Sequence, residues 1–166
     1  MKKLILLLFT IVSFTSFSQQ IENNWNTDIN KSIQISQNTG KPLMLFFTGS
    51  DWCGWCKKLV REVYKTSEFH KWAKKNVVLV EIDFNTPFRT RIKLAQKGKV
   101  KLTDHENEMI NLSNTFGVRG YPTVYFVKAV KGKDGKIQLK TLGQTGYVAG
   151  GPTKWISTAT QQLQKK

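Results

Sequence analysis

The chain contains very little cysteine and histidine, and this scarcity excludes several kinds of site. Cys53 and Cys56 are the only cysteines among 166 residues, too few for a domain built on disulfides. Zinc requires four ligands, or three and a water, yet there is no second Cys-x-x-Cys, and His70 and His105 are not at ligand spacing from this one. Covalent haem requires a histidine directly after the second cysteine, where this chain has Lys57. We therefore expect no metal and no cofactor.

Long hydrophobic runs are also lacking. The apolar run at 4–12, "LILLLFTIV", follows two lysines and precedes "SFTSFS", and it is too short for a stable membrane anchor. This layout predicts a secretory signal peptide over residues 1–18, cleaved after Ser18, in preference to a membrane-anchoring helix. No cysteine lies near the junction, which argues against a lipid-anchored lipoprotein. Export would place the cysteine pair where disulfides persist.

Acidic residues are scarce as well. The chain has 26 basic and 11 acidic residues, a formal net charge of +15, which becomes +13 when residues 1–18, with two lysines and no acid, are removed. Acidic partners, anionic membranes and nucleic acid are all electrostatically possible. No arginine-rich run or base-stacking motif accompanies the charge, so we interpret it as general surface character and expect no nucleic-acid partner.

Internal repeats and low-complexity linkers are absent, so we predict a single domain over residues 19–166. Periodicity, caps and turn residues predict alternating helices and strands, and hence an α/β fold in three layers with a central mixed sheet of about four strands. Helices are expected at 25–38, from 53 onward, at 67–76, 89–96 and 104–115 and from 152, and strands at 43–47, 77–84, 123–127 and 137–142.

The cysteine pair lies where a buried strand gives way to a helix. At a helix N-terminus, free N–H groups lower a thiol pKa, and the thiolate is the attacking species in exchange. This position predicts that Cys53 attacks a partner disulfide and that the less exposed Cys56 resolves the mixed disulfide. A purely structural disulfide is disfavoured because the closed loop is very short. Trp52 and Trp55 are interpreted either as an apolar rim for docking or as ordinary packing.

Two motifs together resemble the thioredoxin superfamily over residues 41–162. "SDWCGWCKKL" opens a helix, and "FGVRGYPTVYF" leads into a strand and hairpin. Within that superfamily the first motif is similar to secreted thioredoxin-like proteins of Gram-negative bacteria with a CGWC site. The resemblance implies that Cys53 is the nucleophile and Cys56 the resolving cysteine. It also implies that Pro122 is a cis-proline against the dithiol and that Tyr121 presents its backbone to a substrate strand.

The sequence departs from thioredoxin at several positions. Gly54 and Trp55 separate the cysteines, where thioredoxin has Gly-Pro and strong oxidants have a histidine. The strand at 43–47 lacks thioredoxin's buried aspartate. Glu81 on the next strand is either a proton acceptor for Cys56 or a solvent-facing edge residue, and we favour the second interpretation. A basic insert at about 86–104 is additional, and the region near residue 25 is expected to be helical where thioredoxin begins with a strand.

We therefore predict an exported, periplasmic thiol–disulfide oxidoreductase that reduces protein disulfides. A disulfide oxidase or isomerase, or a partner-binding module, remains the alternative. The expected partners are protein disulfides and a membrane electron donor, and the protein is expected to be a monomer. Besides the two cysteines, the predicted site includes supporting residues Trp52, Gly54, Trp55, Lys57, Tyr121 and Pro122. The basic insert, with Arg89, Arg91 and Lys93, predicts an acidic docking partner.

Overall fold

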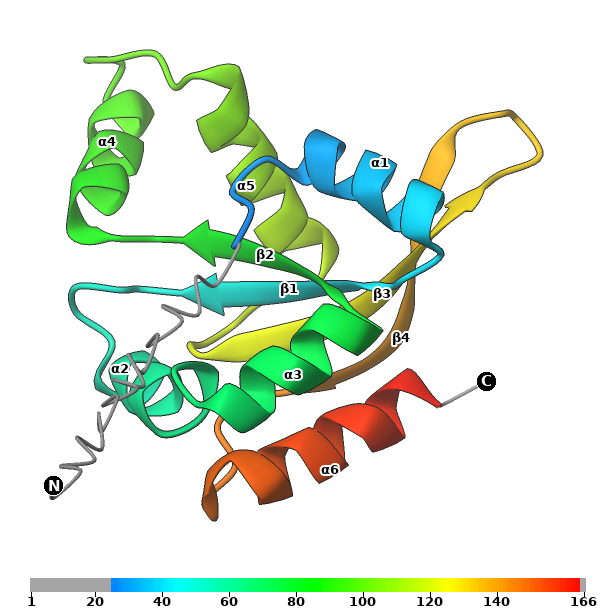
Figure 1. Ribbon diagram of the computed structural model, residues 1–166. Coiled ribbons are helices and arrows are strands. Elements are labelled where there is room, and N and C mark those ends of the chain that lie inside the picture. Colours follow the sequence, from blue (N-terminus) through cyan, green and yellow to red (C-terminus); the bar gives the residue numbers. More distant parts are fainter. Residues whose placement is uncertain (1–24, 165–166) are drawn as a thin grey trace, which may run out of the picture.

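The computed structural model describes residues 25–164 (Figure 1). The predicted signal peptide and its cleavage site lie outside the described residues. Within that range no helix is long and apolar enough to cross a membrane. The elements are α1 (Ile29–Thr39), β1 (Leu43–Thr48), α2 (Gly54–Leu59), a π-helical turn η1 (Val60–Tyr64), α3 (Ser67–Asn76), β2 (Val78–Asp83), α4 (Thr86–Gln96), α5 (Asp104–Thr115), β3 (Thr123–Lys131), β4 (Ile137–Thr145) and α6 (Gly151–Leu163).

Within residues 25–164 the strands form one four-stranded sheet in the order β2-β1-β3-β4. β1 and β2 run parallel, whereas β3 runs antiparallel to β1 and to β4. The sheet is therefore mixed, as predicted. Helices α2, α3 and α6 cover one face and α1 and α5 the other, so the predicted three-layer architecture is confirmed (Figure 1).

The central strand β1 explains why its sequence is a continuous apolar run. Met44 and Phe46 pack into the core beneath α3 and α6. Leu43, Leu45 and Phe47 point to the opposite face and pack with residues of α1 and α5. Because successive side chains of a strand alternate between faces, a strand covered on both sides must be apolar at every position.

The N-terminal part of the described chain differs from the prediction. Helix α1 begins at Ile29 because the Asp28 carboxylate caps it by accepting the Lys31 N–H. The predicted start at Trp25 is wrong: this residue precedes the helix and packs its ring against Phe46. Asn26 pairs in parallel with Val80 on the edge strand β2, so a short extended segment precedes the helix.

Local caps determine the other helix boundaries. The predicted capping box of Thr103 and Glu106 is present at α5. Helix α4 begins at Thr86, three residues before the predicted start, because the Asn85 side chain caps it. The chain restarts as α3 after η1, where Thr66 supplies the cap. The basic segment at 86–104 therefore consists mainly of α4 and its connection to α5.

The parallel pair β1 and β2 positions the site. Their carboxyl ends lie at the same end of the sheet, where α2 and α4 begin (Figure 1). This is the end of an α/β sheet at which binding sites commonly form. The strand β1 delivers the chain to the cysteine motif, and β2 delivers it to the basic segment.

Candidate active site

Cys53 and Cys56 form a disulfide at the start of α2. Cys53 is the N-cap of that helix, and its Sγ accepts the backbone N–H of Cys56 at 3.1 Å. The Cys53 residue is 6% exposed and Cys56 1%. The prediction that Cys56 is the less exposed of the two is confirmed. A helix N–H aimed at Cys53 Sγ is an arrangement that favours a thiolate at this atom.

The turn before Cys53 is pinned to β2 and α4. Both carboxylate oxygens of Asp51 accept the Thr86 N–H, at 3.0 and 3.1 Å. Partial desolvation raises the pKa of Asp51, but the hydrogen bonds from Thr86 outweigh it and leave the pKa lowered. Ser50 donates from its N–H and its hydroxyl to the Asp83 carboxylate. These bonds hold the cysteine motif against the end of the sheet.

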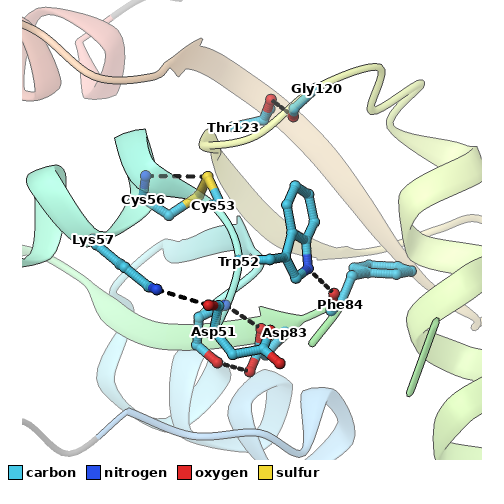
Figure 2. Close-up of a disulfide and its surroundings, with 10 residues drawn as sticks. Asp51, Trp52, Cys53, Cys56, Lys57, Asp83, Phe84, Gly120 and Thr123 are labelled. Carbon is cyan, nitrogen blue, oxygen red and sulfur yellow. Dashed lines mark hydrogen bonds between the residues drawn. A yellow bond between two sulfur atoms is a disulfide. The ribbon is translucent and has the colours of Figure 1, made fainter. Parts of the chain in front are cut away.

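Trp52 folds back over this turn. Its Nε1 donates to the Phe84 carbonyl oxygen at 2.7 Å (Figure 2). Its ring meets Tyr121 edge-on, with centroids 5.5 Å apart. A Cβ at Gly49 would lie 2.3 Å from the indole, so glycine is required there for steric reasons. The Arg89 guanidinium lies over the indole, 4.4 Å from the ring centroid. Trp52 is thus both packed and partly exposed, at 39%.

Trp55, between the two cysteines, is 58% exposed. Its ring packs against Tyr147, which follows β4, with centroids 5.2 Å apart. The Lys58 ammonium lies 5.1 Å from the Trp55 centroid and 5.0 Å from that of Tyr147. The Tyr147 hydroxyl donates to Glu62 at 2.6 Å, and this bond lowers the pKa of Glu62. Tyr147 was missed from the sequence, and the contact of Lys58 with Trp55 was not predicted.

The proline motif also reaches the site. The Tyr121–Pro122 peptide bond is cis, as the resemblance implies. Thr123 closes the turn before β3 by donating its hydroxyl to the Gly120 carbonyl at 2.7 Å (Figure 2). A Cβ at Gly146 would lie 3.0 Å from the Pro122 carbonyl oxygen, so the segment carrying Tyr147 passes close to the proline. The loops after α5 and after β4 therefore converge on the cysteine motif.

Two predicted supporting residues have more limited roles in the structure. Lys57 donates its ammonium to the Asp51 carbonyl at 2.7 Å, which ties the start of the turn to α2. A Cβ at Gly54 would meet no atom within 4 Å, so glycine is not required there by packing. The roles of both residues in substrate binding stay predictions.

A cavity of about 250 Å³ lies behind the dithiol. It is lined by Thr48, Ser50, Cys56, Lys57, Val60, Arg61, Lys65 and Glu81. Glu81 lies on the face of β2 that points toward α2, since its neighbour Leu79 on the same face packs into that core. Burial, and then repulsion by Asp83, raise the pKa of Glu81. Glu81 is therefore half-buried on the edge strand β2 and borders this cavity, and its role as a proton acceptor for Cys56 stays a prediction.

The basic segment contributes unequally to the site. Arg91 forms an ion pair with Glu106, and the bond from Arg91 together with the Thr103 N–H lowers the pKa of Glu106 to about 2. Arg91 therefore links α4 to α5 through this ion pair. Lys93 is exposed on α4 and Arg89 covers Trp52, so within this segment Arg89 is the cation that contacts the cysteine motif.

Comparisons with known proteins agree with the fold and the cysteine site described above. The model of a thioredoxin-like domain matches residues 29–149. "Disulfide bond reductase DsbH" of Chlamydia pneumoniae is 29% identical over 133 residues, which cover 80% of this chain and 69% of that protein. The solved structure of a DsbH oxidoreductase superposes with a TM-score of 0.64 at 26% identity, covering 86% of this chain and 85% of that one. A thioredoxin from Thermus thermophilus shares the fold, with a TM-score of 0.57 at 14% identity over 84% and 86% of the two chains.

The family match and the DsbH relative confirm the predicted thioredoxin-like fold. Together with a cysteine pair that forms a disulfide, they also confirm the predicted class of enzyme, a thiol–disulfide oxidoreductase. On these grounds the chain belongs to the thioredoxin-like domain family.

Proposed function

We propose that the protein is an exported reductase of protein disulfides. The observation that carries the proposal is the hydrogen bond from the Cys56 N–H to Cys53 Sγ at the start of α2. In the dithiol form, this donor and the other N–H groups of the first helical turn would stabilise a thiolate on Cys53. Cys53 is also the more exposed of the two cysteines, so its sulfur is the one that a partner reaches first.

The first step is attack by the Cys53 thiolate on one sulfur of a client disulfide. A bond forms between Cys53 Sγ and that sulfur, and the client disulfide breaks. The second client sulfur leaves as a thiolate and takes a proton from solvent. The Tyr121–Pro122 segment is proposed to hold the client chain by strand-like pairing with its backbone, alongside the supporting residues Trp52, Gly54, Trp55 and Lys57.

In the second step Cys56 resolves the mixed disulfide. Its thiol loses a proton and attacks Cys53 Sγ, and the first client sulfur leaves as a thiolate. The client has then gained two electrons, and the cysteine pair is left as the disulfide present in the structure. We propose that Glu81 accepts the Cys56 proton across the shared cavity, which has room for several water molecules at about 30 Å³ each.

Two observations support the reducing direction over oxidation or isomerisation. Gly54 and Trp55 separate the cysteines, and neither is a histidine that would stabilise the thiolate further and increase oxidising power. The relative DsbH carries the name of a disulfide bond reductase. A reductase must itself be re-reduced, and we propose a membrane electron donor for this step. The proposal also includes cleavage after Ser18, a periplasmic location and a monomeric state.

Trapping with a Cys56→Ser variant tests the exchange reaction. The variant should accumulate a mixed disulfide on Cys53, and mass spectrometry of the trapped species identifies the client. The matched control is Cys53→Ser, which should trap nothing. Trapping by neither variant in a cell that contains oxidised client proteins would overturn the proposed function.

Equilibration of the native dithiol with glutathione buffers tests the direction separately. A reduction potential near that of thioredoxin, roughly −270 mV, is expected of a reductase. A potential near −120 mV, typical of a strong oxidant, would replace the reductase with the oxidase alternative. An absence of disulfide reduction in an insulin assay, together with no trapped mixed disulfide, would favour the partner-binding module.

A further inference from the structure

Two aromatic pairs flank the cysteine motif from different parts of the fold. The Trp52 rim consists of Trp52, Tyr121 and Arg89, and it lies where β2 leads into α4. The Trp55 rim consists of Trp55, Tyr147 and Lys58, and it lies where β4 leads into α6. Because β2 and β4 are the two edges of the sheet, the rims approach the dithiol from opposite edges.

Each rim has the same composition, an exposed tryptophan beside a tyrosine with one cation over the ring. Arg89 lies 4.4 Å from the Trp52 centroid, and Lys58 lies 5.1 Å from that of Trp55. Within residues 25–164 neither cation has a carboxylate within 4 Å, since the ion pairs there join Arg61 to Glu62 and Arg91 to Glu106. A cation over a ring face still has several N–H donors with which it can bind an incoming acceptor.

The acidic side chains near the site are engaged in internal hydrogen bonds. Asp51 accepts from Thr86, and Asp83 accepts from Ser50. Glu62 accepts from Tyr147, and the nearby charge of Lys58 also lowers the pKa of Glu62. Part of the field of Lys58 is therefore compensated within the molecule by Glu62. Both rims present positive charge next to exposed apolar surface.

We propose that the preferred client is an extended segment that carries a carboxylate on each side of its reacting cysteine. This inference rests on the proposed function and names its substrate class. The two indoles supply the apolar contact, as large aromatic side chains do at many interfaces. Arg89 and Lys58 supply one charge-assisted hydrogen bond each to the flanking carboxylates. Because the cations lie toward opposite edges of the sheet, acids on both sides of the cysteine are preferred.

The test uses synthetic peptides whose single cysteine is disulfide-linked to the same reporter thiol. The residues that flank the cysteine are glutamate on both sides, glutamine on both sides or lysine on both sides. Two singly acidic peptides carry glutamate only before or only after the cysteine. The second-order rate constant for release of the reporter by the reduced protein is measured at low and at physiological ionic strength. The doubly acidic peptide should react about tenfold faster than the glutamine peptide at low salt, with a smaller ratio at higher salt.

Charge-matched variants separate local recognition from the general basic character of the protein. Arg89→Gln and Lys58→Gln should each reduce the preference about threefold, and each should act mainly on one of the two singly acidic peptides. Arg89→Lys, which keeps the charge, should retain most of the preference. Lys71→Gln on α3 removes the same charge from an exposed position and should leave the preference unchanged.

Equal rates for the acidic and glutamine peptides would overturn the inference. So would a loss on Lys71→Gln as large as the loss on Arg89→Gln, because the preference would then arise from net charge alone. Failure of every peptide, the glutamine peptide included, would count against the proposed exchange reaction instead. Far-ultraviolet circular dichroism of each variant checks that the fold is intact.

Discussion

The two sulfur atoms of the site lie in different surroundings, although they are bonded to each other. Cys53 Sγ accepts a helix N–H, and the exposed indoles on either side of Cys53 in the sequence carry Arg89 and Lys58 over their rings. Cys56 is almost fully buried and borders a cavity that it shares with Glu81. The surface side is suited to binding a partner, and the cavity side is suited to moving a proton.

Under the proposed function, this separation would let a site without thioredoxin's buried aspartate accept the proton of the resolving thiol. β1 is apolar through Phe47 and supplies no acid next to Cys56. The acid comes from the neighbouring parallel strand, since Glu81 is paired in register with Phe46. Its side chain therefore lies on the same face of the sheet as α2, one strand away from the motif.

Glu81→Gln should produce the largest kinetic change on the cavity side. As the proposed proton acceptor, Glu81 acts only when ionised, so resolution of the mixed disulfide should slow as the pH falls through its raised pKa. In the variant, resolution of the mixed disulfide should be about tenfold to a hundredfold slower, an effect near the low end of those measured for general bases. The rate should also lose this dependence on pH. Rapid-quench measurement of the mixed disulfide against pH checks this, and an unchanged pH profile would exclude Glu81 as the acceptor.

The same variant has an expected effect on stability, of opposite sign to its effect on rate. A carboxyl whose folded pKa is raised destabilises the folded state once the pH exceeds its unfolded value, and the full cost is present above the folded pKa. Replacement by glutamine removes this cost. Urea unfolding should therefore show the variant gaining stability relative to the native protein as the pH rises from about 4 to 7. A gain that is independent of pH would point to packing instead of ionisation.

On the surface side, the two tryptophans should differ in their contribution to stability. Trp52→Ala removes the hydrogen bond to Phe84 and the ring contact with Tyr121, and should cost about 2 kcal/mol of unfolding free energy. Trp55→Ala removes a mostly exposed ring and should cost below about 1 kcal/mol. Trp52→Phe isolates the indole N–H and should cost about 1 kcal/mol. Equal costs for the two alanine variants in urea unfolding would contradict the distinction between them.

The features of the fold and the site that depend on nearby residues could be predicted from the sequence. The helix start at Cys53, the lower exposure of Cys56 and the capping box at Thr103 depend on neighbours within a few residues, and they were predicted correctly. The family resemblance supplied the cis bond at Pro122. Each of these features is local or belongs to a motif.

Features that depend on contacts between distant segments were not predictable. Alternation along β2 assigns Glu81 to a face, but what covers that face is determined by how α2 and η1 pack over it. Tyr147 meets Trp55 only because the loop after β4 returns to the site. Trp25 reads as part of a helix by periodicity, yet it packs on Phe46 from extended backbone because Asp28 is the stronger start signal. Periodicity does not specify which tertiary contact prevails.

The smallest expected effect distinguishes two arginines of α4 that look equivalent in the sequence. Arg91→Gln removes the ion pair with Glu106 and should lower the stability only slightly, since the pair is partly exposed to solvent. Because the pKa of Glu106 is lowered to about 2, the cost should be present above the ordinary carboxyl pKa and should disappear as the pH falls toward 2.

Arg91→Gln should leave the preference for acidic peptides intact, whereas Arg89→Gln should reduce that preference with little change in stability. If Arg91→Gln weakened the preference as much as Arg89→Gln, the whole basic segment would be the docking element, and the contact between Arg89 and Trp52 would not be the selective feature.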